Sequence, residues 1–403
     1  MAVQTKKHAY HIWGVALAGL LGAALQARLV NFCQMFRLMW GVPAEWANGV
    51  AGWDTLTSAA CKALNPLAKT YRYLRLIGAS GTTDGWMPIT DTTMIANNWA
   101  LTSGASYVTL DSRKLLDPGG AAVGGKTPAM LWLENAIAEL DGKGFDGVVL
   151  DYWHPTMAAF SDTTPDGYPD TATWQAAWIP FITYICNGLA AAGYEVVGNM
   201  AGYLSQATPG SIYETQRALL DGVVYESPWF HTLSGNHRDQ ADQLIRAADL
   251  RDDPLDVWMA DIGLSTSFSN YGSKHRYAYA LFHCFADDFE HKFWGTNRST
   301  APYYDDEEVL FDFDMGNFTG AATQPVAGCY QRQFNNGTVD CMALVNTNEA
   351  TSWSYVFTGS WRDPDGVLHS GTESIAARTG LLLKQEVSGS PSNFRRRRRK
   401  LGR

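Results

Sequence analysis

The chain has 403 residues, of which 46% are hydrophobic and 18% are charged. This profile excludes disordered and fibrous proteins and allows a large buried core, and the length suits a barrel of about 250–320 residues plus a minor domain. Seven of the 31 basic residues lie in residues 395–403, which leaves 24 basic against 40 acidic residues in the rest of the chain. Because so acidic a body repels a phosphate backbone, no nucleic-acid partner is expected.

The first 28 residues allow two interpretations. Lys6 and Lys7 precede the apolar stretch 12–27, which resembles a signal peptide in charge and length but is too short and glycine-rich for a membrane span. A strand-like segment, 29–35, follows at once, so residues 1–28 are interpreted either as signal-like or as a helix that caps a barrel. A secreted or extracytoplasmic location is expected, with a cytoplasmic one as the alternative.

Residues 29–303 alternate short β-branched or aromatic runs with longer amphipathic stretches. This alternation indicates βα units around a parallel sheet. No glycine-rich dinucleotide fingerprint follows the first strand, so the pattern favours an α/β fold of the (β/α)8 TIM barrel type over a doubly wound sheet. The expected strands are 29–36, 70–77, 106–110, 145–152, 195–199, 222–228, 256–262 and 291–295, and the expected helices are Thr55–Ala68, Pro128–Leu140, Trp174–Ala192, Ile212–Leu220, Arg238–Leu250 and Ser273–Phe285.

After residue 303 the helical signal stops. Residues 304–387 are predicted to form a small C-terminal antiparallel β domain, sandwich-like, with short strands in 328–346, 352–357 and 374–384 and with Asn-Gly, Asp-Gly and Thr-Gly turns between them. The tail, 388–403, is interpreted as disordered, with attachment to nucleic acid or to an anionic surface as the alternative.

The six cysteines show neither a CxxC pair nor zinc-ligand spacing, so no structural metal is expected. Cys329 and Cys341 flank a predicted Asn-Gly hairpin and are candidates for a disulfide bond. Buried free thiols are the alternative.

The most informative feature is a pair of similar segments 75 residues apart, DGVVLD (146–151) and DGVVYE (221–226), each of which ends in a carboxylate. The fourth and sixth strands of such a barrel contribute to the same interior layer, so Asp151 and Glu226 are predicted to meet at its mouth. Each buried charge costs on the order of several kcal/mol to desolvate. A catalytic role is a natural reason for a chain to accept that cost. The alternative is that the two carboxylates cap helices or pair with arginines at the rim.

Two carboxylates on facing strand ends are typical of glycoside hydrolysis. Carboxyl groups about 5–5.5 Å apart suit a retaining enzyme, whereas an inverting enzyme needs a wider gap. We expect a retaining enzyme in which Asp151 is the nucleophile, kept ionised by hydrogen bonds. Glu226 is expected to be the acid/base, with its pKa raised by burial.

Side chains suited to sugars follow several predicted strands. Sugar hydroxyl groups bind carboxylates, amides and imidazoles, and aromatic faces cover the apolar face of the ring. Taken singly, each residue fits packing at the barrel top equally well. The candidate substrate-binding residues are Tyr152, Trp153, His154, Asn199, Trp229, Asp261, Trp294 and Asp111.

Four motifs carry a resemblance to a known family. In this order, FDGVVLDYWHP (145–155), VGNMAG (197–202), DGVVYESPW (221–229) and VWMADIG (257–263) resemble the hypothetical glycosyl hydrolase family fifteen. That family belongs to the barrel group related to endo-polygalactosaminidase-like and α-galactosidase-like hydrolases. The resemblance covers most of 29–300 and implies an Asp at the end of the fourth strand and a Glu at the end of the sixth, which match Asp151 and Glu226.

The sequence thus predicts a hydrolase that cleaves O-glycosidic bonds of a polysaccharide or glycan, with a carbohydrate substrate, no cofactor and no membrane span. A metal-dependent barrel hydrolase is disfavoured because no HxH pair lies near 31–37. The remaining alternative is a non-catalytic carbohydrate-binding barrel that acts as a surface or particle recognition module. The sugar, its anomeric form, endo or exo action and the oligomeric state stay open.

Overall fold

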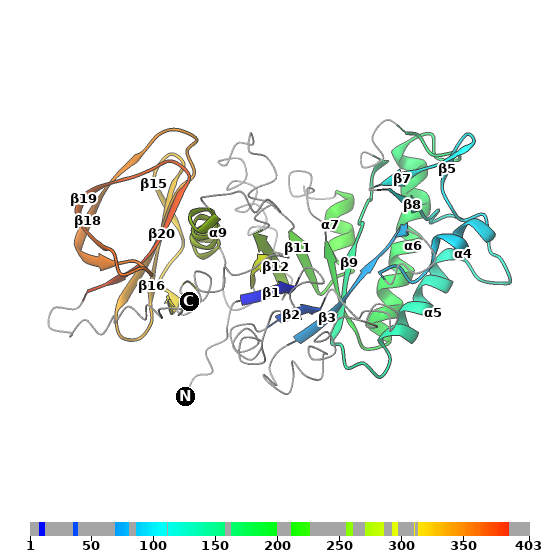
Figure 1. Ribbon diagram of the computed structural model, residues 1–403, viewed down its shortest axis with the longest axis horizontal. Helices are drawn as coiled ribbons and strands as arrows, with labels where there is room; N and C mark the ends of the chain where they lie inside the picture. The colour runs from blue at the N-terminus through cyan, green and yellow to red at the C-terminus, as the bar shows by residue number, and fades with distance from the viewer. Residues whose placement is uncertain are drawn as a thin grey trace, which may run out of the picture. The chain divides into compact units, whose positions relative to one another are not determined.

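The computed structural model describes residues 8–12, 35–38, 69–79, 86–110, 112–157, 163–199, 211–225, 255–260, 271–285, 292–296, 310 and 313–386. The chain divides into two compact units (Figure 1). The first unit consists of Met1–Pro228, Leu250–Leu264 and Asp287–Ala301, and the second of Trp229–Asp249, Ser265–Ala286 and Pro302–Arg403.

Eight parallel strands of the first unit pair in a closed ring. In ring order they are β1 (His8–Ile12), β2 (Met35–Leu38), β3 (Lys69–Arg75), β9 (Gly147–Asp151), β10 (Glu195–Asn199), β11 (Gly222–Tyr225), β12 (Leu255–Ala260) and β13 (Lys292–Thr296), which returns to β1. The apolar residues of β9 and β10 are buried, as expected for parallel strands that are covered on both faces. The predicted parallel barrel is therefore present, and Asp151 ends its fourth strand.

The order of the strands corrects two expectations. The predicted strand 106–110 is not part of the barrel, and the first barrel strand is β1, which lies inside the segment interpreted as signal-like or as a capping helix. Cleavage after residue 28 would remove this strand. Because one strand is lost and one is gained before residue 147, Asp151 keeps its expected place at the end of the fourth strand.

Short antiparallel pieces occupy the chain between β3 and β9. They include β5 (Thr102–Ser103), β6 (Ser106–Tyr107) and β7 (Thr109–Leu110), together with β4 (Gly78–Ala79), β8 (Arg113–Leu115) and helix α4 (Asp91–Ala96). β5 pairs with β6, and β8 pairs with both β4 and β7. Residues 106–110 form edge strands of two residues with an exposed Tyr107, because their Ser and Thr side chains do not supply the apolar faces of a barrel strand.

Two long helices, α5 (Pro128–Leu140) and α6 (Thr171–Ala191), pack against each other in the first unit. The Thr127 hydroxyl caps α5 by accepting from the Met130 N–H at 3.3 Å, and Asp170 caps α6 in the same way through the Thr173 N–H at 2.8 Å. One face of α6 is buried through Trp174, Trp178, Phe181, Ile182, Ile185, Cys186 and Leu189.

The predicted helices at 128–140, 174–192, 212–220 and 273–285 correspond to α5, α6, α7 (Ile212–Arg217) and α9 (Tyr271–Phe285). The predicted helices 55–68 and 238–250 lie outside the described residues. Among the helices that the structure describes, none has the length and apolar character needed to cross a membrane.

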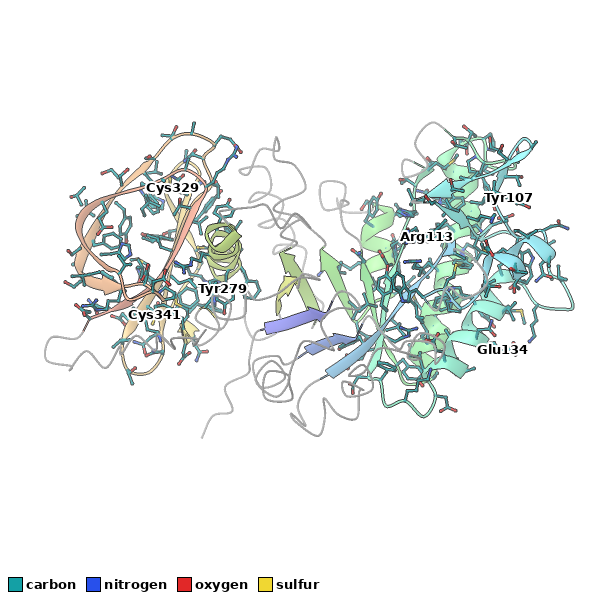
Figure 2. All side chains as sticks on the ribbon, in the orientation of Figure 1. Tyr107, Arg113, Glu134, Tyr279, Cys329 and Cys341 are labelled. Carbon is teal, nitrogen blue, oxygen red and sulfur yellow. The ribbon has the colours of Figure 1, made fainter. Side chains whose placement is uncertain are left out.

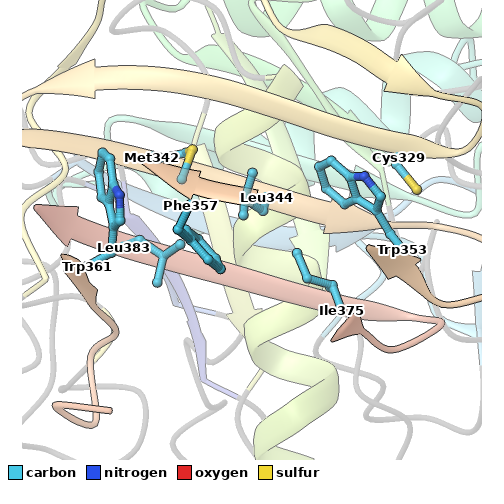
Figure 3. Packing of buried hydrophobic residues seen from close by; sticks show 8 residues of the cluster. All are labelled: Cys329, Met342, Leu344, Trp353, Phe357, Trp361, Ile375 and Leu383. Atoms are coloured by element: carbon cyan, nitrogen blue, oxygen red, sulfur yellow. The ribbon is translucent and has the colours of Figure 1, made fainter. Parts of the chain in front are cut away.

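The second unit contains the predicted antiparallel β domain. Its strands are β14 (Asn317–Phe318), β15 (Thr323–Val326), β16 (Cys329–Asn335), β17 (Asp340–Asn346), β18 (Trp353–Arg362), β19 (Leu368–Ile375) and β20 (Thr379–Gln385), in the order β14-β16-β17-β20-β18-β19, with β15 beside β16. Figure 3 shows the core that β16 to β20 share, in which Trp353, Phe357 and Trp361 of β18 face Met342 and Leu344 of β17.

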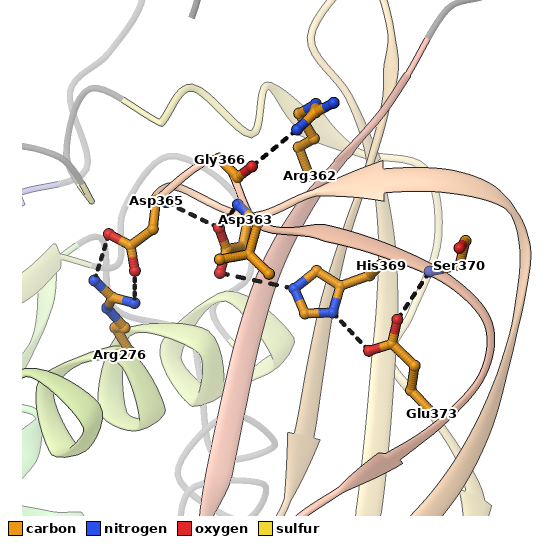
Figure 4. Close-up of polar contacts among 9 residues, drawn as sticks. Arg276, Arg362, Asp363, Asp365, Gly366, His369, Ser370 and Glu373 are labelled. Carbon is orange, nitrogen blue, oxygen red and sulfur yellow. Dashed lines mark hydrogen bonds and ion pairs between the residues drawn. The ribbon is translucent and has the colours of Figure 1, made fainter. Parts of the chain in front are cut away.

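Helix α9 packs against β16, β17 and β20 of this sheet. β17 is buried on both faces, and the Cys284 thiol of α9 donates to the Ala343 carbonyl at 3.8 Å. At the other end of the helix, Arg276 forms a two-pronged ion pair with Asp365, in which Nη2 lies 2.8 Å from Oδ1 (Figure 4). The chain therefore enters the second unit three times: between the sixth and seventh barrel strands, between the seventh and eighth, and after the eighth.

The turn predictions are largely confirmed. Asn336-Gly337 connects β16 to β17, and Asp365-Gly366 connects β18 to β19. The Thr-Gly turn predicted after 352–357 is absent, because Thr358-Gly359 lie inside β18 at a shift in its register with β19, where Gly359 has φ of 85°. The predicted disordered tail lies outside the described residues.

Cys329 and Cys341 are free and buried, so the candidate disulfide is absent. Cys329 is in register with Asn346, whereas Cys341 is in register with Phe334, so the two lie at opposite ends of the hairpin (Figure 2). Five residues of strand span about 17 Å, well beyond the reach of a disulfide bond.

The contact between α9 and β20 yields a stability prediction. A Cβ atom at Gly380 would lie 2.7 Å from Ala280 Cβ and 2.8 Å from Tyr277 Cα, whereas a Cβ at Gly320 would meet nothing within 4 Å. Gly380→Ala is expected to lower the free energy of unfolding by about 1–3 kcal/mol, because the helix must move. Gly320→Ala, the matched control, is expected to stay within about 0.5 kcal/mol of the parent in urea unfolding. Equal effects of the two substitutions would contradict this packing.

His369 of β19 lies between two carboxylates, that of Glu373 on the same strand and that of Asp363, the residue after β18 (Figure 4). His369 Nδ1 is 2.8 Å from Glu373 Oε2, and Nε2 is 3.7 Å from Asp363 Oδ2, an ion-pair distance. The facing Asp363 carboxylate, opposed by burial and reinforced by Glu373, raises the pKa of His369 above its ordinary 6.5. Burial alone would raise the pKa of both carboxyl groups, but the interaction with His369 outweighs it and lowers them.

This cluster predicts a window of pH in which it stabilises the domain. The raised pKa of His369 contributes stability that is fully present below pH 6.5 and is lost as pH rises through the folded value. The lowered carboxyl pKa values contribute stability above their ordinary 3.8 and 4.5, which is lost on acidification. His369→Gln is therefore expected to reduce the free energy of unfolding by about 1 kcal/mol near pH 5.5 and by less at pH 9. Urea titrations at the two pH values test this, and a pH-independent difference would contradict it.

Candidate functional site

The alternation of β3 decides which of its side chains enter the barrel. Arg72 points outward, where its Nη2 forms a 2.5 Å ion pair with Glu139 Oε1 of α5. With a side-chain period of two, Tyr71, Tyr73 and Arg75 therefore face the interior. Because Arg75 is in register with Asp151 of β9, the last interior residues of the third and fourth strands lie side by side.

Asp151 receives a hydrogen bond on each of its oxygens from a neighbouring strand. The Tyr73 hydroxyl of β3 donates to Oδ2, and Asn199 Nδ2 of β10 donates to Oδ1 at 2.9 Å. Asp151 itself is half-buried, while Tyr73 and Asn199 are buried. Donors on both oxygens stabilise the charged carboxylate and fix its rotation. The structure thus brings together two predicted site residues, Asp151 and Asn199, and adds a third that was not predicted.

A buried cation lies beside this carboxylate. Arg75 is 3% exposed, and its Cζ lies 4.4 Å from the ring centroid of Trp86 and 5.5 Å from that of Tyr152. The backbone of Arg75 is fixed as well, because its carbonyl accepts from Trp132 Nε1 of α5 at 3.0 Å. Attraction between a guanidinium and aromatic faces is strongest where water is excluded, so Arg75 adds a fixed positive charge to the end of β3.

The residue after Asp151 has a left-handed backbone. Tyr152 has φ of 60°, a conformation that costs of order 1–3 kcal/mol in a residue other than glycine and that occurs often at functional sites. Its ring lies against Gly78, where a Cβ would approach Tyr152 Cε1 to 2.7 Å, and its hydroxyl accepts from Arg113 Nη1 at 2.9 Å. The Tyr152 ring is therefore packed directly against the short strand β4.

Trp153 is buried among other side chains. It is 1% exposed, its Nε1 donates to Gln216 Oε1 at 2.7 Å, and its ring lies 6.3 Å from that of Trp178. The ring and its polar atom both contact other side chains of the protein, which favours a packing role for Trp153, and the sugar contact stays a prediction. His154 is half-buried, with its ring 5.8 Å from that of Tyr152.

The remaining predicted residues are not described. Glu226, Trp229, Asp261 and Asp111 lie outside the described residues, and for Trp294 only the backbone, in β13, is described. The register of the sixth strand is nevertheless known, because Val224 pairs with Asn199.

A second tyrosine–carboxylate pair lies at the opposite end of the same interior face. The Tyr71 hydroxyl donates to Glu195 Oε2 at 2.5 Å, and Tyr71 is in register with Gly147, four residues before Asp151. Burial and the neighbouring Glu195 raise the pKa of Tyr71 well above its ordinary value. This pair joins β3 to β10 at the amino ends of the strands. Residues at that end of a barrel usually stabilise the fold and do not take part in catalysis.

Tyr73 and Arg75 were missed by sequence reasoning, although a signal was present. The segment KTYRYLR places Tyr71, Tyr73 and Arg75 at alternate positions of a strand expected to be buried. Polar atoms on the interior face of a buried strand need partners inside the barrel, and that requirement points to the neighbouring strand ends.

The comparisons with known proteins place the fold. No family model and no curated protein matches the chain, so the resemblance to hypothetical glycosyl hydrolase family fifteen rests on its motifs. Among solved structures, the α-amylase of Geobacillus thermoleovorans matches with a TM-score of 0.52 and 11% identity, over 95% of this chain and 99% of that chain.

Two further structures match to a similar degree. A debranching enzyme of Nostoc punctiforme has a TM-score of 0.52 and 10% identity, over 94% of this chain and 98% of that chain. An α-glucosyl transfer enzyme has a TM-score of 0.52 and 9% identity, over 95% and 99%. These neighbours are (β/α)8 barrels with a C-terminal β domain, and at such identities the likeness shows the fold alone.

The burial of Trp153 leads to a test of its role. Trp153→Phe keeps an aromatic ring but leaves the buried Gln216 Oε1 without its donor, so we expect the free energy of unfolding to fall by about 1–3 kcal/mol. Urea unfolding measures this loss. Unchanged stability together with weakened glycan binding would support the predicted sugar contact.

Proposed function

We propose that the chain is a retaining glycoside hydrolase that cleaves O-glycosidic bonds of a polysaccharide or glycan, with Asp151 as nucleophile and Glu226 as acid/base. The observation that carries the proposal is the carboxylate of Asp151 at the carboxyl end of the fourth barrel strand, held by Tyr73 and Asn199. Active sites of such barrels lie at this end of the strands.

The geometry of Asp151 suits attack on an anomeric carbon. A carboxylate whose rotation is already fixed loses little further conformational freedom when the substrate binds. This lowers the entropic part of the barrier to displacement. In the first step an oxygen of Asp151 bonds to the anomeric carbon while Glu226 protonates the leaving oxygen. In the second step Glu226 accepts a proton from water, and the water oxygen displaces Asp151, so the anomeric configuration is retained.

Two independent considerations support Glu226 as the partner. Val224 is in register with Asn199, whose side chain binds Asp151, and Glu226 follows Val224 by two positions in the sequence. The proposal takes the side-chain alternation of the strand to continue to Glu226. The motif order that resembles hypothetical glycosyl hydrolase family fifteen also implies an Asp and a Glu at these two strand ends.

A polysaccharide substrate is supported by the fold neighbours. They include an α-amylase complexed with acarbose and a debranching enzyme soaked with acarbose, both of which have the barrel and C-terminal β domain in this order. Fold alone does not determine function, so the substrate class is part of the proposal.

Paired substitutions test the proposed carboxylates. Asp151→Asn and Glu226→Gln are each expected to reduce hydrolysis in a reducing-sugar screen over a glycan panel by about 10²- to 10⁴-fold or more, because each removes a group that reacts in the transition state. Glu134→Gln removes an exposed carboxylate that pairs with Lys126, and it is expected to leave activity unchanged.

Rescue with azide distinguishes the nucleophile from the acid/base. Asp151→Gly with azide is expected to form a glycosyl azide of inverted configuration, whereas Glu226→Ala with azide is expected to form one of retained configuration, because only the second variant keeps the covalent intermediate. Full hydrolysis by both the Asn and Gln variants would contradict the site. If wild type and variants bind glycans equally and none turns over any of them, a non-catalytic carbohydrate-binding barrel is the better account.

A further inference from the structure

We infer that Tyr73 is a positioning residue that stabilises the Asp151 carboxylate as it leaves the glycosyl–enzyme intermediate, so that its hydroxyl promotes the second step of the reaction. This inference rests on the proposed function. It adds a second role for a residue of the third strand, which in the mechanism above only fixes the rotation of Asp151.

The surroundings of Tyr73 fix its hydroxyl. The residue is 5% exposed, and its ring meets the ring of Trp86 edge to face, with centroids 5.9 Å apart and an interplanar angle of 90°. Arg75 Cζ lies 5.9 Å from the Tyr73 ring centroid. Tyr73 is in register with Val149, two residues before Asp151, so the ring extends along the interior face toward the barrel mouth and its hydroxyl meets Oδ2.

The charge of Asp151 changes in opposite directions in the two steps. In the first, an electron pair of one carboxylate oxygen forms the bond to the anomeric carbon, and the negative charge disappears into an ester. In the second, the bond between the anomeric carbon and the Asp151 oxygen breaks, the electron pair returns to the carboxylate, and Glu226 holds the proton that the attacking water gives up.

A hydroxyl donor binds a carboxylate more strongly than it binds a neutral ester, because charge-assisted hydrogen bonds are shorter and stronger. The hydrogen bond from Tyr73 therefore stabilises the transition state of the second step, where negative charge develops on Asp151, more than it stabilises the ester from which that step starts. In the first step the same hydrogen bond stabilises the starting carboxylate. Removing the Tyr73 hydroxyl is thus expected to slow breakdown of the intermediate selectively.

Tyr71 supplies a matched control on the same strand. Like Tyr73 it is buried, faces the interior and donates its hydroxyl to a carboxylate, that of Glu195, but it does so at the opposite end of the strands. Tyr71→Phe and Tyr73→Phe therefore each remove one buried hydroxyl from the same face of β3. A merely structural role would make the two variants behave alike.

The experiment traps and then releases the intermediate on the full-length protein. Wild type, Tyr73→Phe and Tyr71→Phe are incubated with a panel of 2-deoxy-2-fluoro- and 5-fluoroglycosyl fluorides of both anomeric configurations. The labelled peptide is identified by mass spectrometry. Excess reagent is then removed, and the return of the unlabelled intact mass gives the breakdown rate, while melting temperatures report on folding.

We expect the label on Asp151 in all three proteins and a breakdown rate about 10- to 100-fold slower in Tyr73→Phe than in wild type, the size expected for a hydrogen bond to a charged group. Tyr71→Phe is expected to stay within about twofold of wild type. Labelling of Asp151 with equal breakdown rates in Tyr73→Phe and wild type would overturn the role of Tyr73 and leave the nucleophile in place. Slowing by the same factor in both variants would also overturn it, and a label on another residue would overturn the proposed function and this inference together.

Discussion

The hydrogen bonds to the two oxygens of Asp151 are the interaction on which the candidate site depends. A carboxylate at the end of a buried strand is costly unless donors replace the water it loses. The donors here, Tyr73 and Asn199, come from the strands on either side. Strands three, four and five are therefore joined through a single side chain as well as through their backbone ladders, and the position of Asp151 follows from the register of the barrel.

The register of the strands also places two tyrosine–carboxylate pairs at different heights inside the barrel. Tyr71 and Glu195 form a tyrosine–carboxylate pair near the amino ends of the strands, and Tyr73 and Asp151 form another toward the carboxyl ends. The ends differ in what surrounds the pair, because Arg75 with its aromatic neighbours Trp86 and Tyr152 lies only at the second. In a barrel, this is the end at which loops enclose a substrate.

Local patterns predicted the fold better than they predicted contacts. The strand that ends at Asp151, helix α5 and the hairpin turns follow from periodicity and turn residues, which act over a few positions. The first strand, His8–Ile12, was not predicted because one of its two partners in the closed ring, residues 292–296, lies at the far end of the barrel sequence, and no local pattern records that pairing. The same reason applies to Tyr73, which is 78 residues before its partner Asp151, and to Trp153, whose burial depends on Gln216 and Trp178.

The central claim is that Asp151 and Glu226 act on one glycosidic bond from opposite sides, as in a retaining enzyme. The most direct measurement is a crystal structure of the full-length protein in which both carboxyl groups are located. The account predicts that the Glu226 side chain faces Asp151 across the barrel mouth, with carboxyl groups about 5–5.5 Å apart. A separation of about 6.5–9.5 Å would contradict a retaining mechanism, and a Glu226 side chain that points away from the mouth would contradict the site itself.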